Sequence, residues 1–149
     1  MDRVLGIPIV PLLLGLAGLI PFAWGAATSL SDPLHEWGSF ALGPRFVAPY
    51  VGLFYGAVIL SFMSGVIWGF AAKGDDPLLY VLSVVPAIYA FLFTGGGAEG
   101  AARALMFGFA GLLLIDRYAQ GLGLAPGWWL RLRVILTAGV LFCLLPVAL

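Results

Sequence analysis

The sequence predicts an all-α integral membrane protein, a single domain over residues 1–149 folded as a bundle of five transmembrane helices. Hydrophobic residues make up 62% of the chain, and charged residues make up 9% where soluble domains carry about 25%. Five apolar stretches are each about long enough to cross a bilayer, and short segments rich in charge, glycine and proline separate them. Positive charges are also divided unevenly between alternate connections, as in multi-pass membrane proteins.

The first predicted span covers residues 4–30, which carry no charge. Pro8, Pro11 and Pro21 interrupt it, so a kink is compatible with a crossing of this length. The small residues at positions 25–27 raise the alternative of a cleaved signal peptide. The apolar stretch is longer than the roughly 7–15 residues of a signal peptide's apolar region, so a membrane-spanning helix is favoured.

A polar segment, residues 31–47, follows the first span. Asp32 followed by Pro33 fits an N-cap and a first helical position. We therefore expect a short amphipathic helix on the membrane surface between Pro33 and Leu42. The second span is predicted over residues 48–72.

The third span is predicted over residues 77–94, opened by Asp76 as the N-cap and Pro77 as the first helical residue. Pro86 lies in its middle and is expected to kink it, because proline removes a helical hydrogen bond and its ring collides with the preceding turn.

The fourth span is predicted over residues 98–115 and the fifth over residues 128–145, ending at Pro146. A short connection, residues 118–127, joins them. Because the connection is short, the two helices should be antiparallel neighbours.

Positive charge predicts the orientation, since short cytoplasmic loops are enriched in lysine and arginine. The amino terminus and the second and fourth connections share one face of a five-span bundle. That face holds Arg3, Lys73, Arg117, Arg131 and Arg133, whereas the opposite face holds Arg45 and Arg103. The bias predicts an amino terminus inside and a carboxyl terminus outside.

Small residues four positions apart mark helix faces where backbones can approach closely in lipid. In the second span, Gly52 and Gly56 form one such stripe, and a second stripe lies at about 220° around the helix. The second stripe consists of Ser61, Gly65 and Gly69. In the fourth span the same pattern is made by Gly100, Ala104 and Gly108. These residues are predicted to pack helices together.

Charged residues cluster where the fourth and fifth spans meet, at Asp116, Arg117, Arg131 and Arg133. Asp116 could pair with Arg131 or Arg133 and so fix the helix ends, which is the favoured interpretation. Alternatively, the arginines bind the headgroup of an anionic phospholipid. A substrate site is the third interpretation.

Motifs for catalysis and cofactors are scarce. His35 and Glu36 form an acid–base pair suited to neutral pH, but no second histidine, nucleophile elbow or metal-ligand spacing accompanies them. The sequence has no phosphate-binding loop, dinucleotide fingerprint or zinc-protease motif, and Cys143 is its one cysteine. We expect no cofactor and no metal. Zero net charge makes nucleic acid an unsuitable partner, which leaves membrane lipids and other membrane proteins.

Several segments resemble the family named after transmembrane protein 69, small membrane proteins of bacteria and mitochondria. The second span carries the most specific string, YGAVILSF at residues 55–62, followed by Gly65 and Trp68-Gly69. Weaker matches are AGLIPF at 17–22, SVVP at 83–86, WLRLR at 129–133 and LT at 136–137.

The resemblance implies a five-span membrane protein without an established activity, and it supplies no catalytic residues. The chain departs from the family at Ile67, because members often have a histidine or another basic residue just before the second-span tryptophan. If that polar residue serves a shared activity, this chain lacks it.

Three functions are compatible with these observations. The leading hypothesis is a non-enzymatic accessory subunit of a larger, energy-transducing membrane complex, because the spans lack buried charge and carry many small-residue faces. The second is a binder or transporter of an apolar or lipid-like molecule, in a pocket lined by Tyr55, Trp68, Pro86, Tyr89 and Phe91. The third is an enzyme using His35 and Glu36 at the outer face. No arginine- and serine-rich transit peptide precedes the first span, which favours a bacterial inner membrane.

Overall fold

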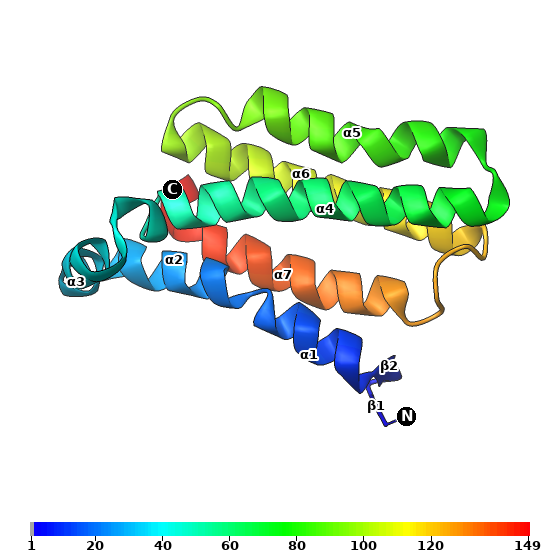
Figure 1. Cartoon of the computed structure of the whole chain (residues 1–149), viewed down its shortest axis with the longest axis horizontal. Helices are drawn as coiled ribbons and strands as arrows, with labels where there is room; N and C mark the ends of the chain where they lie inside the picture. The colour runs from blue at the N-terminus through cyan, green and yellow to red at the C-terminus, as the bar shows by residue number, and fades with distance from the viewer. Residues whose placement is uncertain (1) are drawn as a thin grey trace.

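The computed structural model describes residues 2–149, which form helices and one short β-hairpin. The elements are β1 (Arg3–Val4), β2 (Ile7–Pro8), α1 (Ile9–Ala17), α2 (Ile20–Leu30), α3 (Asp32–Leu42), the 3-10 helix η1 (Pro44–Phe46), α4 (Tyr50–Gly74), α5 (Pro77–Phe93), α6 (Ala98–Gly121) and α7 (Trp129–Ala148). Helices α5, α6 and α7 each run antiparallel to the helix before, and α1 and α2 together form a further rod beside α7 (Figure 1). The predicted helical class is confirmed.

The outer surface of the bundle is apolar. Large side chains such as Leu14, Phe107, Leu114 and Phe142 are exposed, while the interior is filled by a separate set of apolar side chains. That interior set includes Phe22, Leu60, Leu105, Phe109 and Leu112. A protein that is apolar both inside and outside is suited to lipid as its solvent. The chain is therefore an integral membrane protein.

Four helical segments in the described part of the chain are long and apolar enough to cross a membrane. They are Ile9–Leu30, Tyr50–Gly74, Ala98–Gly121 and Trp129–Ala148. Helix α5 is also apolar but has 17 residues, about 25 Å of helix against a hydrocarbon core of about 30 Å. The transmembrane bundle is thus confirmed, and the fifth crossing stays a prediction.

The predicted start of the first span, at residue 4, is wrong. The chain first makes a β-hairpin in which Arg3 pairs with Pro8 and Val4 with Ile7. Leu5 and Gly6 form its turn with positive φ angles of 55° and 76°, a conformation that glycine adopts easily and that no helix can contain. The helix therefore begins at Ile9.

The first span is also broken into two helices. Helix α1 ends at Ala17, Leu19 donates to the carbonyl of Leu16, and α2 begins at Ile20. Pro21 explains the position of the break, because it has no N–H and its ring would collide with the carbonyl four residues earlier.

Helix α6 runs six residues beyond the predicted end at residue 115, so the first part of the expected connection, residues 118–121, is helical. It ends in a Schellman motif, in which Gly123 donates to Gln120 and Leu124 to Ala119. Gly123 has the positive φ of 73° that this motif requires. Helix α7 likewise continues past Pro146 to Ala148.

The polar segment after the first span contains a helix at the expected place, α3, and its position on the membrane surface stays a prediction. Its N-cap is Ser31 rather than Asp32, which is already the first helical residue. On α5, the predicted cap is confirmed, since Asp76 Oδ1 accepts a hydrogen bond of 2.7 Å from the Leu79 amide.

Pro86 lies inside α5 and alters its hydrogen bonding. The amide of the next residue, Ala87, donates to Ser64 Oγ on α4 at 3.0 Å. A backbone donor near the proline is therefore paired across the helix interface, which joins α4 to α5 in the interior.

Candidate functional site

Helix α7 directs a basic and a polar side chain into the bundle. Its buried face repeats at helical spacing through Arg133, Thr137, Val140, Leu144 and Ala148. An arginine is therefore carried on the same face as the apolar residues that pack against the other helices. Any charged group so placed needs a partner of opposite charge.

That partner is Asp116 on α6. Arg133 Nε donates to Asp116 Oδ2 at 2.9 Å, and their side chains are 4% and 0% exposed. The indole Nε1 of Trp129 donates to Asp116 Oδ1 at 2.7 Å. Both carboxylate oxygens thus accept hydrogen bonds, and the pair is electrically neutral as a unit. It lies within about two turns of the ends of α6 and α7.

Two polar atoms beside this pair remain unpaired. Within residues 2–149, Arg133 Nη2 and Thr137 Oγ1 are buried and have no hydrogen-bond partner. Buried polar atoms are nearly always bonded, because an unpaired one costs about 1–3 kcal/mol. These two atoms therefore mark a place where a further hydrogen-bonding group fits.

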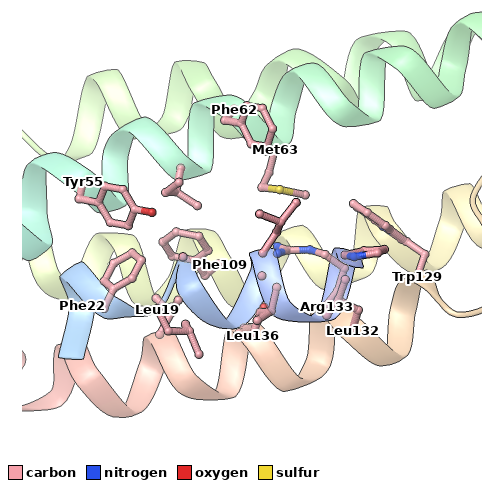
Figure 2. Close-up of a pocket in the computed structure, with 17 residues that line it drawn as sticks. Leu19, Phe22, Tyr55, Phe62, Met63, Phe109, Trp129, Leu132, Arg133 and Leu136 are labelled. Atoms are coloured by element: carbon pink, nitrogen blue, oxygen red, sulfur yellow. The ribbon is translucent and has the colours of Figure 1, made fainter. Parts of the chain in front are cut away.

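Both residues line a cavity of about 310 Å³. Its walls come from α1, α2, α4, α6 and α7 and are otherwise almost entirely apolar: Pro11, Leu14, Gly15, Gly18, Leu19, Phe22, Tyr55, Ile59, Phe62, Met63, Phe109, Trp129, Leu132, Leu136 and Val140. Figure 2 shows Arg133 reaching from α7 toward the middle of this space, with Trp129 beside it and Phe22 and Phe109 farther along. The size is at the lower end of small-molecule sites.

The break in the first span helps to form the cavity. Gly15 and Gly18 flank the end of α1 and line it. The hydroxyl of Tyr55, on α4, lies 3.7 Å from the position that a Cβ at Gly18 would occupy. In Figure 2 this hydroxyl points into the space from the side opposite Arg133.

The predicted charged cluster divides into an inner and an outer part. Asp116 and Arg133 are paired in the interior, whereas Arg117 and Arg131 are exposed. Arg131 Nη1 donates to the carbonyl of Leu5 in the hairpin turn. The sequence left the partner of Asp116 open between Arg131 and Arg133, and the geometry selects Arg133.

The residues expected to line one apolar pocket lie apart. Tyr55 lines the cavity, but Pro86 and Tyr89 line a separate groove of about 230 Å³ between α5 and α6. Trp68 is exposed and packs edge-on against Tyr80, with ring centroids 5.0 Å apart. Phe91, also expected there, is exposed.

The small residues that were predicted to pack helices together differ in their surroundings. A Cβ on Gly56 would come within 2.8 Å of Leu105 on α6, and one on Gly108 within 2.7 Å of Leu60 on α4, so these two glycines lie at a close contact. Gly52 is buried against Leu144, and Ala104 is half-buried. Within residues 2–149, a Cβ on Gly65, Gly69 or Gly100 would meet open space, and Ser61, which precedes Gly65 and Gly69 on α4, is exposed.

The other candidate groups do not come together in a site. His35 forms a 3.0 Å hydrogen bond between its Nε2 and the carbonyl of Ala48, which joins α3 to the start of α4, and Glu36 is exposed. Ile67, the position at which the resemblance implied a polar residue, is fully buried. In residues 2–149 no group of three or more metal-ligating side chains comes together.

Sequence reasoning missed Trp129 as a partner of Asp116 and did not place Thr137 in the candidate site. The available signal was the spacing of Arg133, Thr137 and Val140, which is the helical repeat of a single face. The cavity itself had no signal in the sequence, because it depends on where α1 ends and how α2 is placed.

Comparison with known proteins gives a family without an assigned activity. The family described as protein of unknown function, DUF3429, matches residues 7–149. Transmembrane protein 69 from Xenopus tropicalis is 37% identical over 145 residues, which cover 89% of this chain and 51% of the Xenopus protein. The chain thus spans about half the length of this relative. No solved structure matches the chain.

Proposed function

Because this chain belongs to the transmembrane protein 69-like family, described as DUF3429 of unknown function, we propose a function from its cavity. The protein binds an apolar or lipid-like small molecule inside the membrane. The observation that carries this proposal is an apolar cavity of about 310 Å³ into which two unpaired buried polar groups project.

The arrangement in the membrane is part of the proposal. The chain crosses five times, with α5 as the shortest crossing, and its amino terminus and the α4–α5 and α6–α7 connections face the cytoplasm. The excess of lysine and arginine at that end supports this orientation. Arg117 and Arg131 are exposed there, where anionic lipid headgroups would meet them. The membrane we propose is a bacterial inner membrane.

Filling the cavity tests the binding function. Ile59 lines the cavity, and Ile59→Phe would occupy part of its volume. Ile88 is exposed on α5, so Ile88→Phe makes the same change on an outer face. The purified protein in nanodiscs is labelled with an alkyl diazirine photoprobe, and adducts are mapped by mass spectrometry.

Saturable labelling of Tyr55 and Met63 is expected for the wild type and for Ile88→Phe. Ile59→Phe should reduce it at least about fivefold, because a filled cavity excludes the probe. Labelling of the outer faces should be unsaturable in all three proteins. Equal labelling of Tyr55 in wild type and Ile59→Phe would contradict the binding function.

A second candidate, the accessory subunit, is supported by one separate observation. The stripe of Ser61, Gly65 and Gly69 on α4 is exposed, and within residues 2–149 nothing lies near the positions that Cβ atoms of the two glycines would take. A transmembrane helix of another protein could approach this stripe closely.

Affinity purification in mild detergent, followed by mass spectrometry, tests the accessory role. A partner should co-purify stoichiometrically with the wild type and be lost with Gly65→Leu. Gly100→Leu is the matched control, because Gly100 is an exposed glycine on α6 with similar open space within residues 2–149. Recovery of the wild type without any stoichiometric partner would count against the role.

A further inference from the structure

We propose, resting on the proposed binding function, that the ligand carries a neutral carbonyl oxygen that accepts a hydrogen bond from Arg133 Nη2. The Thr137 hydroxyl, one turn farther along the same face of α7, is the second donor. Both groups line the cavity, are at most 4% exposed, and lack a hydrogen-bond partner within residues 2–149.

The first step concerns the type of group. A guanidinium has five N–H donors and no acceptor, so whatever meets Arg133 Nη2 must offer an acceptor. A hydroxyl such as that of Thr137 can donate to the same kind of atom. An oxygen acceptor can therefore pair with either orphaned atom, whereas a pure hydrocarbon pairs with neither.

The second step concerns charge. Asp116 already balances Arg133, and both of its oxygens are bonded, to Arg133 Nε and Trp129 Nε1. A carboxylate or phosphate entering the cavity would leave one uncompensated negative charge in an apolar interior, which is costly. The oxygen therefore belongs to an uncharged group, and a carbonyl, as in a ketone, an ester, an amide or a quinone, is an acceptor that avoids this cost.

The third step concerns the rest of the ligand. Apart from Arg133 and Thr137, the cavity offers mainly aliphatic and aromatic side chains, with Tyr55 Oη at the opposite side. The ligand is thus an apolar body with a carbonyl at one end. Its source is either a free small molecule or an ester carbonyl of a membrane lipid.

The experiment compares three tritiated probes of equal chain length: a methyl ketone, an alkane and a fatty acid at alkaline pH. Binding is measured by scintillation proximity on tagged protein in nanodiscs of ether-linked phospholipid, which contain no carbonyl of their own. The ketone should bind about three- to tenfold more tightly than the alkane, as expected for one or two buried hydrogen bonds. The anion should bind more weakly than the ketone.

Thr137→Val supplies a variant that keeps the shape of the side chain and removes its hydroxyl. It should weaken ketone binding about threefold and leave alkane binding unchanged. Thr94→Val is the matched control, because the Thr94 hydroxyl bonds the Ala90 carbonyl at the end of α5, outside the cavity. An unchanged ketone-to-alkane ratio in Thr137→Val would overturn the role of Thr137.

The remaining outcomes separate this inference from the binding function. Equal affinity for alkane and ketone would overturn the carbonyl inference and keep an apolar binder. Tightest binding of the anion would overturn the neutral class, and absence of saturable binding by every probe would sink the binding function as well. The ketone measurement is repeated in nanodiscs of ester-linked phospholipid. Weaker ketone binding there than in ether-linked nanodiscs identifies lipid ester carbonyls as competing occupants, and unchanged binding favours a free molecule as the natural ligand. Both results are compatible with a ligand that carries a carbonyl.

Discussion

Two ion pairs involve α6, one near each end, and their surroundings differ completely. Glu99 and Arg103 stand four residues apart on the first turns, with side chains 55% and 56% exposed. Asp116 and Arg133 join α6 to α7 near the other end, with side chains 0% and 4% exposed. The first pair is local and accessible, and the second is formed between helices and enclosed.

The difference teaches that the burial of the two side chains, rather than their charge, decides how strongly folding depends on an ion pair. An exposed pair gains little, because its surroundings solvate each charge almost as well as the partner does. An enclosed pair depends on mutual compensation, so the loss of either member leaves a charge with no solvent. In the enclosed pair, Arg133 also keeps a buried donor, Nη2, that has no partner within residues 2–149, and the residue lines the cavity.

The largest effect is expected from Asp116→Ala. Removing the carboxylate leaves Arg133 buried without a counter-charge, which costs about 3–5 kcal/mol of unfolding free energy. The measurement is reversible unfolding in mixed micelles with increasing sodium dodecyl sulfate. Glu36→Ala, which removes an exposed carboxylate, should change stability by less than about 0.5 kcal/mol.

A double variant sharpens this prediction. Asp116→Leu combined with Arg133→Met replaces both charges by apolar groups of similar volume, so much of the lost stability should return. The same protein should lose the part of its preference for the ketone over the alkane that Arg133 supplies, while the Thr137 hydroxyl keeps its own part. A loss below about 1 kcal/mol in Asp116→Ala would show that the buried charge is compensated in another way.

The helical membrane class followed from composition and apolar stretches, because the length and polarity of a crossing helix are fixed by the bilayer. Element ends were less predictable. The hairpin at the amino terminus depends on positive backbone φ angles at Leu5 and Gly6. The pattern of an uncharged apolar stretch does not predict such angles. The end of α6 is set by Gly123, which lies two residues beyond the helix and outside its apolar pattern.

The candidate site was predicted only in part. Asp116, Arg131 and Arg133 all lie near the short connection between α6 and α7, so the sequence predicted that Asp116 is close to both arginines. The choice between Arg131 and Arg133 depends on the rotation of α7 about its axis, since positions two apart lie about 200° around a helix. The cavity arises from the gap between α1 and α2, so its lining comes from helices far apart in the sequence.

A smaller effect is expected from Trp129→Phe. The substitution keeps an aromatic ring but removes the Nε1 donor to Asp116 Oδ1, a hydrogen bond to a charged acceptor worth about 1.5–3 kcal/mol. Reversible unfolding in mixed micelles measures the loss of unfolding free energy. Trp128→Phe is the control, because the side-chain donors to the Asp116 carboxylate within residues 2–149 are Trp129 and Arg133. Equal losses in the two variants would mean that ring packing, and not the hydrogen bond, is responsible.

The smallest effect is expected from Glu99→Gln. The substitution removes the charge of the exposed pair and leaves the 2.9 Å hydrogen bond from Arg103 Nε to the Ala148 carbonyl. The loss should be about 0.3–0.5 kcal/mol, the usual worth of a pair four residues apart on a helix. Because salt screens accessible charges, this loss should vanish at about 1 M salt, whereas the Asp116→Ala loss should persist. Thermal denaturation in a non-ionic detergent at low and high salt measures the stability losses of the two variants. A Glu99→Gln loss that persists at high salt would contradict the proposed difference between the two pairs.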